Sequence, residues 1–300
     1  MRWPAARRAG RNPAVRGDEE PRPGDDNGPR KRARWFSRTS TAAVLITALG
    51  VGVAVMVTPA EGAAGDIASS FARAVRHLVS TSQNGRAFTG TPAVGALFTT
   101  SRGKLGPHFC TASVVSSPDG DLVVTAAHCV SGTSGLVFVP GYNGGAKPPY
   151  GMWRVTRIFT DRSWKASSDP DDDVAFLQVG QPGSIVPIED VTGAEQLETG
   201  TPARQLVEVI GYPDTTNKPI ACRNWTREPM SDQLEFDCGG YTDGTSGGPF
   251  LADVNPVTGQ GTVIGVIGGY EQGGLTPQVS YSSMFRANVA ALYRLAEADG

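Results

Sequence analysis

The pattern of apolar and polar positions divides the chain into three parts. Residues 1–38 show almost no apolar periodicity, and residues 41–58 form a continuous uncharged apolar run. Beyond residue 90, short runs rich in Val, Ile and Leu alternate with Gly, Pro, Asn and Asp, as at 93–98, 122–125, 174–179 and 261–267. Many short runs bounded by turn residues predict an all-β sandwich or barrel.

Two segments have helical spacing instead. One covers residues 66–82, before the β-rich region, and is interpreted as a propeptide element or a packing helix. The other closes the chain and predicts a C-terminal helix. Their apolar positions are Ile67, Phe71, Val75 and Leu78 in the first segment, and Phe285, Val289, Leu292 and Tyr293 in the second.

These patterns predict four regions. Residues 1–38 hold eleven Lys/Arg against five Asp/Glu and are expected to be a disordered basic cytoplasmic tail. Residues 39–60 are either a signal peptide, with small-residue cleavage sites at Ala60 or Ala64, or a signal-anchor transmembrane helix through residues 41–58. Residues 61–90 are a linker with the propeptide-like helix, and residues 91–300 form the folded domain. Either reading exports everything that follows the apolar run, so the domain is expected outside the cytoplasm, secreted or anchored.

The charge balance after residue 38 reverses to sixteen Lys/Arg against twenty-four Asp/Glu. An acidic body is repelled by phosphates, which excludes a nucleic acid as the expected partner. The four cysteines form two close couples, Cys110 with Cys129 and Cys222 with Cys238, without the paired C-x-x-C spacing of a zinc site. Two local disulfides are expected, and disulfides persist in oxidising compartments.

A serine lies among glycines in the sequence Thr-Asp-Gly-Thr-Ser-Gly-Gly-Pro, residues 242–249. Glycines let the backbone turn tightly and let a substrate carbonyl approach closely. Ser246 is therefore a candidate nucleophile, and the N–H groups of Gly244 and Ser246 are candidate donors to the oxyanion that its attack creates. A Gly/Ser-rich turn without function is the alternative reading of this stretch alone.

A serine nucleophile needs a base, and the chain has three histidines. His77 lies on the predicted N-terminal helix, and His108 precedes Phe109-Cys110 without a supporting motif, so both are interpreted as surface or packing residues. His128 ends an apolar run in Thr-Ala-Ala-His-Cys, residues 125–129, where a disulfide from Cys129 to Cys110 would fix the loop.

An imidazole base works best when a buried carboxylate orients it. Asp173 enters the apolar run 174–179, whereas Asp169, Asp171 and Asp172 belong to the preceding polar turn. A calcium site in residues 169–173 is an alternative, because clustered carboxylates suit a hard cation, but no ligand-spaced motif is present. The expectation is no metal and no cofactor.

Taken together, His-Phe-Cys at 108–110, Thr-Ala-Ala-His-Cys at 125–129, Asp-Val-Ala at 173–175 and Gly-Thr-Ser-Gly-Gly-Pro at 244–249 resemble the trypsin-like serine peptidases of the chymotrypsin fold. The order His, Asp, Ser is that of the family. The sequences Val-Ile-Gly-Tyr-Pro at 209–213 and Gly-Val-Ile-Gly-Gly at 265–269 are closer to the bacterial trypsin-like and glutamyl-endopeptidase-like branch.

The resemblance implies two packed six-stranded antiparallel β-barrels with a C-terminal helix, and a triad of His128, Asp173 and Ser246 in the cleft between them. It implies that the Cys110–Cys129 disulfide lies near the histidine, and it leaves Cys222 and Cys238 as the second pair. The expected activity is that of a serine endopeptidase acting on protein or peptide substrates, as a monomer. The alternative is an inactive peptidase-fold binding protein at the cell surface.

The same resemblance places Gly240, Gly268 and Gly269 at the specificity pocket. Trypsin-like members have an acid at the position of Gly240, so a preference for Arg or Lys is not predicted. Glutamyl-specific members use a pocket histidine, and no histidine follows His128 in this chain. A preference for glutamate is therefore not predicted either.

Overall fold

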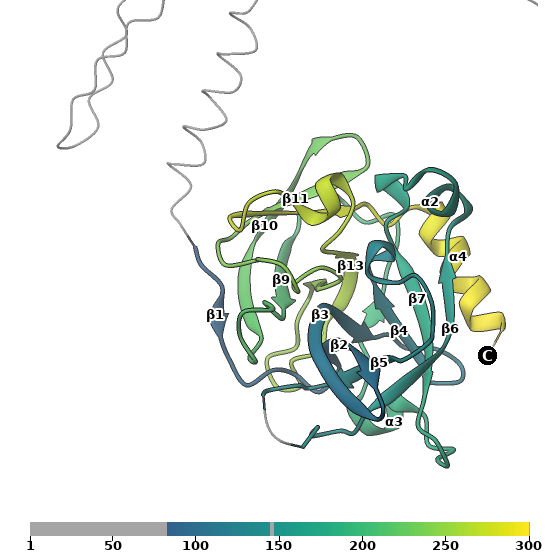
Figure 1. The fold of residues 1–300 in the computed structure, drawn as a ribbon. Helices are drawn as coiled ribbons and strands as arrows, with labels where there is room; N and C mark the ends of the chain where they lie inside the picture. The colour runs from purple at the N-terminus through teal and green to yellow at the C-terminus, as the bar shows by residue number, and fades with distance from the viewer. Residues whose placement is uncertain (1–82, 145–146, 300) are drawn as a thin grey trace, which may run out of the picture. The chain divides into compact units, whose positions relative to one another are not determined.

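Strands dominate both halves of the described part of the chain (Figure 1). In the computed structural model the described residues are 83–144 and 147–299. The predicted tail, the apolar run 41–58, the helix expected over 66–82 and His77 lie outside these ranges. No helix formed by the described residues combines the length and apolar character that a membrane crossing requires.

The first half is a closed six-stranded barrel, in the order β2-β3-β4-β7-β6-β5, and every neighbouring pair is antiparallel. It confirms the β-barrel prediction for this half. Its strands are β2 (Val94–Ser101), β3 (Lys104–Val114), β4 (Leu122–Thr125), β5 (Leu136–Pro140), β6 (Trp153–Thr160) and β7 (Ala175–Gly180).

Strands β4, β5 and β7 are almost continuously apolar because both of their faces are buried. Side chains alternate between the two faces of a strand. In β4, Leu122 and Val124 belong to a core that also includes residues of the second half, whereas Val123 belongs to the core enclosed by the barrel. In β7, Phe176 and Leu177 divide in the same way.

The second half is an eight-stranded sheet in the order β14-β11-β10-β9-β12-β13-β8, with β1 paired to β10. Its core contains both cysteines of the second disulfide. Its strands are β1 (Arg86–Ala87), β8 (Gln196–Leu197), β9 (Leu206–Gly211), β10 (Ile220–Met230), β11 (Gln233–Asp237), β12 (Pro249–Ala252), β13 (Thr262–Val266) and β14 (Val279–Ser283).

This sheet differs from the six-stranded barrel expected for the second half. No strand ladder joins β13 to β14 among the described residues, because β13 ends at Val266 before a turn at Gly268 and Gly269. Hydrogen bonds outside a ladder still connect these two segments: Val266 N–H donates to Ser282 Oγ at 2.9 Å, and Gly268 N–H donates to the carbonyl oxygen of Tyr281 at 3.0 Å. A turn that carries part of the candidate site thus interrupts regular pairing.

The connection between the halves contributes backbone pairing to both. Glu195 N–H donates to the carbonyl oxygen of Val114 in the barrel, and Ser116 N–H donates to the carbonyl oxygen of Glu195. The next two residues form β8, which pairs in parallel with β13. The Glu195 side chain is fully buried at this junction, where Oε2 accepts a hydrogen bond of 2.5 Å from Gly261 N–H.

Short helices occupy the loops, and the predicted C-terminal helix is confirmed as α4 (Ala287–Ala298). Val289, Leu292 and Ala296 of α4 are buried. Figure 1 shows α4 beside β6 and β7 of the barrel, although it follows the second sheet in sequence. The others are α2 (Arg162–Ser167), α3 (Ile188–Thr192) and the 3-10 helices η1 (Ala127–Cys129), η2 (Pro170–Asp172) and η3 (Tyr270–Gly273).

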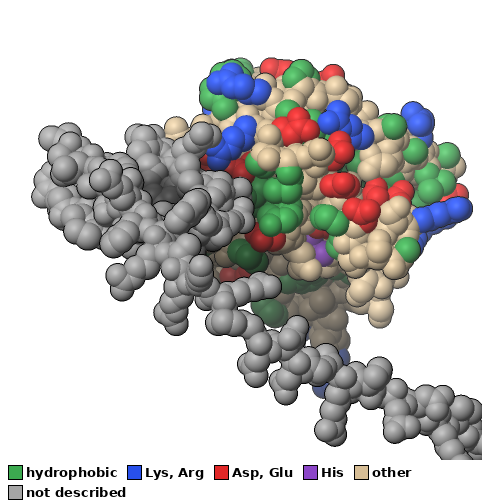
Figure 2. Space-filling model, turned by 90° about the horizontal axis from the view of Figure 1, so that it is seen from above, with side chains coloured by type: hydrophobic (Ala, Val, Ile, Leu, Met, Phe, Trp, Pro, Cys, Tyr) green, Lys and Arg blue, Asp and Glu red, His purple; other side chains and the backbone are tan. Residues whose placement is uncertain are grey.

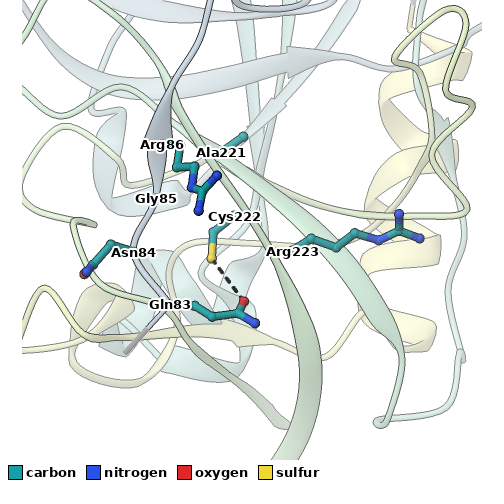
Figure 3. Close-up of a pocket in the computed structure, with 7 residues that line it drawn as sticks. All are labelled: Gln83, Asn84, Gly85, Arg86, Ala221, Cys222 and Arg223. Carbon is teal, nitrogen blue, oxygen red and sulfur yellow. Dashed lines mark hydrogen bonds between the residues drawn. The ribbon is translucent and has the colours of Figure 1, made fainter. Parts of the chain in front are cut away.

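The first described residues join the second sheet. Arg86 and Ala87 pair with Ala221 and Ile220 of β10. Gly239 N–H donates to the carbonyl oxygen of Gln83, next to the second disulfide. Figure 3 shows the Gln83 side chain directed toward Cys222, with 3.8 Å between Gln83 Oε1 and Cys222 Sγ.

Candidate active site

Two loops of the barrel bring His128 and Asp173 together. His128 lies in η1, directly after β4, and the disulfide between Cys110 and Cys129 ties this turn to β3. Asp173 follows η2 and precedes β7, which pairs with β4. The end of β4 and the beginning of β7 lie side by side, and this places the imidazole next to the carboxylate.

The Asp173 side chain is fully buried and holds His128 at two points. Asp173 Oδ1 accepts a hydrogen bond of 2.9 Å from His128 N–H, and Oδ2 lies 2.7 Å from His128 Nδ1. A carboxylate can only accept hydrogen bonds, so Nδ1 is the protonated nitrogen. His128 Nε2 then carries a lone pair and can accept a proton.

A third donor to Asp173 comes from the second half of the molecule. Gly269 N–H donates to Asp173 Oδ2 at 2.9 Å. The preceding residue, Gly268, packs against the same oxygen, and a Cβ atom at Gly268 would lie 3.0 Å from it. Backbone groups of the second half therefore surround a carboxylate of the first, and a side chain at Gly268 would crowd it.

Ser246 lies in the turn before β12. The carbonyl oxygen of Ser246 accepts a hydrogen bond of 2.7 Å from Thr111 N–H in β3. A Cβ atom at Gly247, the next residue, would lie 2.1 Å from Thr125 Oγ1 and 3.1 Å from Ala126 N. The absence of a side chain at Gly247 thus lets the serine turn pack against the strand end that leads to His128.

The backbone around Gly244, a candidate oxyanion-binding residue, leaves two N–H groups without an acceptor in the described chain. Asp214 N–H donates to the carbonyl oxygen of Asp243 at 2.8 Å. The peptide unit is planar and trans, so Gly244 N–H points away from that carbonyl. Neither this N–H nor that of Ser246 has a hydrogen-bond acceptor within the described parts of the chain. Both donors are left available to a ligand.

Only glycine fits at this position. Gly244 has a φ of 89°, in the left-handed region, and a Cβ atom there would lie 2.6 Å from both Asp214 N and the carbonyl oxygen of Tyr212. The sequence thus fixes the candidate oxyanion hole through a residue that no other type can replace without backbone movement.

Of the three predicted catalytic residues, His128 and Asp173 lie in the first half of the described residues and Ser246 lies in the second. His128 and Asp173 are hydrogen-bonded to each other, whereas no hydrogen bond joins Ser246 to His128 among the described residues. Hydrogen bonds between a nucleophile and its base are often long without substrate and tighten in the reacting complex.

A cavity of about 260 Å³ opens beside Ser246. Three stretches, 241–243, 245–246 and 272–277, line it together with Ile267. Asp243 is the only Asp, Glu, Lys, Arg or His side chain among these lining residues, and it is exposed. The Tyr241 hydroxyl donates to the carbonyl oxygen of Val209 at 2.6 Å and is thus already paired. The cavity therefore offers uncharged walls with one acid.

The three glycines predicted for the specificity pocket are not among the residues that line this cavity. Gly240 faces the first described residues, since a Cβ atom there would lie 3.4 Å from Ile220 and 3.9 Å from Gly85 N. Gly268 and Gly269 contact Asp173. Residues 272–277 form much of the wall of this cavity, and their sequence, Gln-Gly-Gly-Leu-Thr-Pro, contains none of the motifs described above.

His108 is buried, in agreement with its interpretation as a packing residue. It also donates from Nε2 to the carbonyl oxygen of Pro213 at 3.0 Å. Pro213 precedes Asp214, whose N–H holds the Asp243 carbonyl. His108 thus helps to fix the backbone segment whose N–H binds the carbonyl oxygen of Asp243, next to the candidate oxyanion hole.

The acidic turn before Asp173 has protein partners for its carboxylates. Asp169 accepts from Asp171 N–H at 3.1 Å, Asp171 accepts from Gln233 Nε2 at 2.6 Å, and Asp172 accepts from Asn288 Nδ2 at 2.7 Å. Burial raises the pKa of Asp172 despite that hydrogen bond. The carboxylates of this turn thus accept hydrogen bonds from protein groups that fix the shape of the turn.

Ligand atoms suited to a metal gather at one place in the described chain, at Cys110, His128 and Cys129. Both sulfurs of this group are bonded to each other. The imidazole of His128 is therefore the one nitrogen or thiolate ligand that this group could offer to a metal.

A second cavity, away from Ser246, is lined by no nucleophile or general base. This cavity, of about 520 Å³, lies beside β1 and is lined by the residues drawn in Figure 3, which include two arginines but no carboxylate and no hydroxyl.

On the face shown in Figure 2, Asp and Glu side chains gather near a hydrophobic patch, while Lys and Arg are scattered among the described residues.

Comparisons with known proteins agree with this geometry. The family model described as Trypsin matches residues 82–283. No curated protein matches the chain in a sequence search. Three solved structures show the same fold at low sequence identity: the protease Anisep from Arthrobacter nicotinovorans, a thermostable serine protease AL20 from an extremophilic microorganism, and a Glu endopeptidase.

The match covers nearly the whole of each of those chains. The Anisep structure has a TM-score of 0.59 and 22% identity, over 71% of this chain and 98% of that one. The AL20 structure has a TM-score of 0.59 and 24% identity, over 70% of this chain and 99% of that one. The Glu endopeptidase structure has a TM-score of 0.55 and 15% identity, over 73% of this chain and 98% of that one.

Proposed function

Because the chain belongs to the trypsin family of serine-type peptidases, we propose that it hydrolyses peptide bonds through Ser246, His128 and Asp173. The observation that carries this proposal is the contact of 2.7 Å between His128 Nδ1 and the buried Asp173 carboxylate. This contact orients the imidazole, and it leaves Nε2 ready to take the serine proton.

The reaction proceeds in two halves. Ser246 Oγ attacks the substrate carbonyl carbon while His128 Nε2 accepts the hydroxyl proton, and the imidazolium is stabilised by Asp173. His128 then gives the proton to the leaving amine, and an acyl-enzyme remains. Water, deprotonated by the same imidazole, attacks the ester and restores Ser246.

Negative charge develops on the carbonyl oxygen in both halves of the reaction. In this proposal the N–H groups of Gly244 and Ser246 receive it, and the lack of an acceptor for either within the described chain supports this role. Donors held in position before the reaction lower the barrier, since no reorganisation is needed when the charge forms. Removing one such donor typically lowers kcat by about 10²–10³-fold.

The cavity beside Ser246 supports a preference for uncharged side chains at the residue before the scissile bond. No Lys, Arg or His lines it, so a glutamate side chain would enter without a counter-charge and beside Asp243. A lysine or arginine side chain would find its only acid in Asp243, which is exposed. An uncharged side chain is not subject to either cost.

We propose that this activity operates outside the cytoplasm. Both cysteine pairs of the described domain are oxidised, and disulfides persist mainly in oxidising compartments. Export through the apolar run 41–58, with or without its retention as an anchor, is the route that the sequence predicts. Monomeric action on protein or peptide substrates is the corresponding proposal for partners.

The decisive experiment is covalent labelling of the full-length protein with a fluorophosphonate, read by intact mass. Wild type should gain one adduct, and Ser246→Ala and His128→Ala should gain none. Ser163→Ala is the matched control, because it removes a hydroxyl from an exposed helix position, and it should label like wild type. An adduct that survives in Ser246→Ala contradicts the assignment of the nucleophile.

The same experiment separates the alternative function. A folded wild type that gains no adduct, and that binds peptides without cleaving them, would favour the inactive binding protein. The paired His128 and Asp173 and the two unpaired backbone N–H groups favour the peptidase, since peptide binding alone requires none of them.

A further inference from the structure

A buried threonine lies where the two halves of the molecule meet. Thr111, in β3, is fully buried. It makes four hydrogen bonds, two through its backbone and two through its hydroxyl, to three separate segments. No motif in the sequence singled it out, because it merely follows Cys110.

Two of these bonds hold the serine turn. Thr111 N–H donates to the carbonyl oxygen of Ser246 at 2.7 Å, and the Thr111 hydroxyl donates to the carbonyl oxygen of Gly244 at 2.9 Å. These are the two residues whose N–H groups are proposed to bind the oxyanion. One residue of the barrel therefore fixes the carbonyls of both.

The other two bonds fix Thr111 itself. Its hydroxyl oxygen accepts from Tyr212 N–H at 2.9 Å, at the end of β9. Its carbonyl oxygen accepts from the hydroxyl of Thr125 at 2.8 Å, three residues before His128. The hydroxyl thus both accepts and donates, which sets its proton toward Gly244.

The hydroxyl matters because Gly244 has unusual backbone freedom. Its φ of 89° is available to glycine, together with many other conformations. The carbonyl before it, of Asp243, is held by Asp214 N–H, and its own carbonyl is held by Thr111. With both neighbouring peptide units tied, Gly244 N–H has one direction. Without the threonine hydroxyl, one of the two ties is lost.

We propose that Thr111 is a positioning residue that holds the oxyanion-binding N–H groups of Gly244 and Ser246 in place from the first barrel. This inference rests on the proposed peptidase function. Thr111 does not touch the substrate. It acts through the orientation of the serine turn, so its hydroxyl contributes to transition-state stabilisation and little to ground-state binding.

The test replaces the hydroxyl while keeping the shape of the side chain. Thr111→Val leaves the backbone N–H bond to Ser246 and removes the bond to Gly244. Its kcat on a peptide substrate should fall about 10- to 100-fold, below the loss for a direct donor, with KM changed by less than about threefold. Thr111→Ser keeps the hydroxyl and should retain kcat within about threefold.

The matched control is Thr192→Val in α3. Thr192 is also buried, its hydroxyl lies within hydrogen-bonding distance of the carbonyl oxygens of Ile188 and Gly193, and these partners lie outside the candidate site. Both valine variants should lose unfolding free energy, Thr111→Val more so because it also leaves Tyr212 N–H without its acceptor, but only Thr111→Val should lose kcat per folded molecule. A merely structural role would lower kcat in both, in step with the folded fraction.

If Thr111→Val does not fold, Thr111→Ser and Thr111→Ala give the same comparison, because they differ from each other only by the hydroxyl. Wild-type turnover together with equal kcat in the variant that lacks the hydroxyl overturns this inference and leaves the peptidase function intact. A wild type without turnover and without a fluorophosphonate adduct overturns both.

Discussion

Gly269 N–H donates a hydrogen bond of 2.9 Å to Asp173 Oδ2, the same oxygen that contacts His128 Nδ1. The donor belongs to the second half of the molecule and the acceptor to the first. The carboxylate that orients the imidazole is therefore positioned by both halves, with a backbone N–H as the donor from the second half.

Adding a methyl group at Gly268 should disturb this arrangement. A Cβ atom there would lie 3.0 Å from Asp173 Oδ2 and 3.2 Å from Ala126 Cβ, so the carboxylate has to move. Gly268→Ala should lower kcat by about tenfold or more, because small displacements of catalytic groups are costly. Steady-state kinetics on a peptide substrate measures this effect.

Gly132→Ala is the matched control for that variant. Nothing lies within 4 Å of a Cβ atom at Gly132, and its φ is not in the left-handed region. It should have wild-type kcat. Equal activity of both alanine variants would show that Asp173 tolerates crowding at this point.

Substrate preference should follow the charge of the cavity beside Ser246. A panel of peptides that differ only at the residue before the scissile bond should give the highest kcat/KM for uncharged side chains and the lowest for glutamate. Asp243→Asn removes the one acid of the lining residues and should narrow the gap between glutamate and glutamine substrates. Strict cleavage after Arg, Lys or Glu would contradict the proposed preference.

The two disulfides should have separable effects. Cys110–Cys129 and Cys222–Cys238 span 19 and 16 residues of sequence, so removing either as a double alanine variant should cost about 3 kcal/mol of unfolding free energy. Urea unfolding measures this loss. The loss of Cys110–Cys129 should also lower kcat, because that disulfide ties the turn that carries His128.

The second double variant serves as the control for the first. Cys238 lies three residues before Tyr241, which lines the cavity, so its removal should change KM more than kcat. Equal losses of kcat in both variants would argue that the disulfides act through global stability alone.

The stability of the fold should fall as pH rises toward neutrality because of Glu195. Burial raises the pKa of Glu195 from its ordinary value of 4.5 to about 7, with the nearby Glu208 adding to the shift and the Gly261 N–H opposing it. The folded state therefore keeps this proton where the unfolded state releases it. Stability attributable to this group is fully present below about pH 4.5, declines between pH 4.5 and 7, and is lost above.

Glu195→Gln should flatten this pH dependence. Relative to wild type, the variant should gain on the order of 3 kcal/mol of unfolding free energy between pH 4.5 and pH 8, measured by urea unfolding at each pH. Glu198→Gln removes the same charge from an exposed position and should follow the wild-type curve. Parallel curves for Glu195→Gln and wild type would contradict the role of burial.

The sequence allowed the β-fold and the candidate triad to be predicted for clear reasons. Strand runs and the C-terminal helix follow local periodicity, and His128, Asp173 and Ser246 each lie in a short motif. The packing of the serine turn against Thr125 and Ala126 agrees with their assignment to one site, which stays a prediction until it is tested by labelling.

Other features depend on contacts between distant segments and leave no local signal. The donor at Gly269 is a backbone N–H, which every residue except proline has, so its partner Asp173 cannot be recognised from residue type. Thr111 contacts Gly244 across 133 positions of the chain. The wall formed by residues 272–277 depends on a turn at Gly269 that ends regular pairing after β13.

The two-residue strand β1 also has a consequence for how the protein behaves among copies of itself. By pairing with Ile220 and Ala221, it covers backbone groups of β10 that would otherwise form an open sheet edge. Open edges recruit strands from other chains and begin aggregation. A cleavage that removed residues 83–87 would leave the candidate catalytic groups in place, yet it would expose this part of β10 to pairing with strands of other chains.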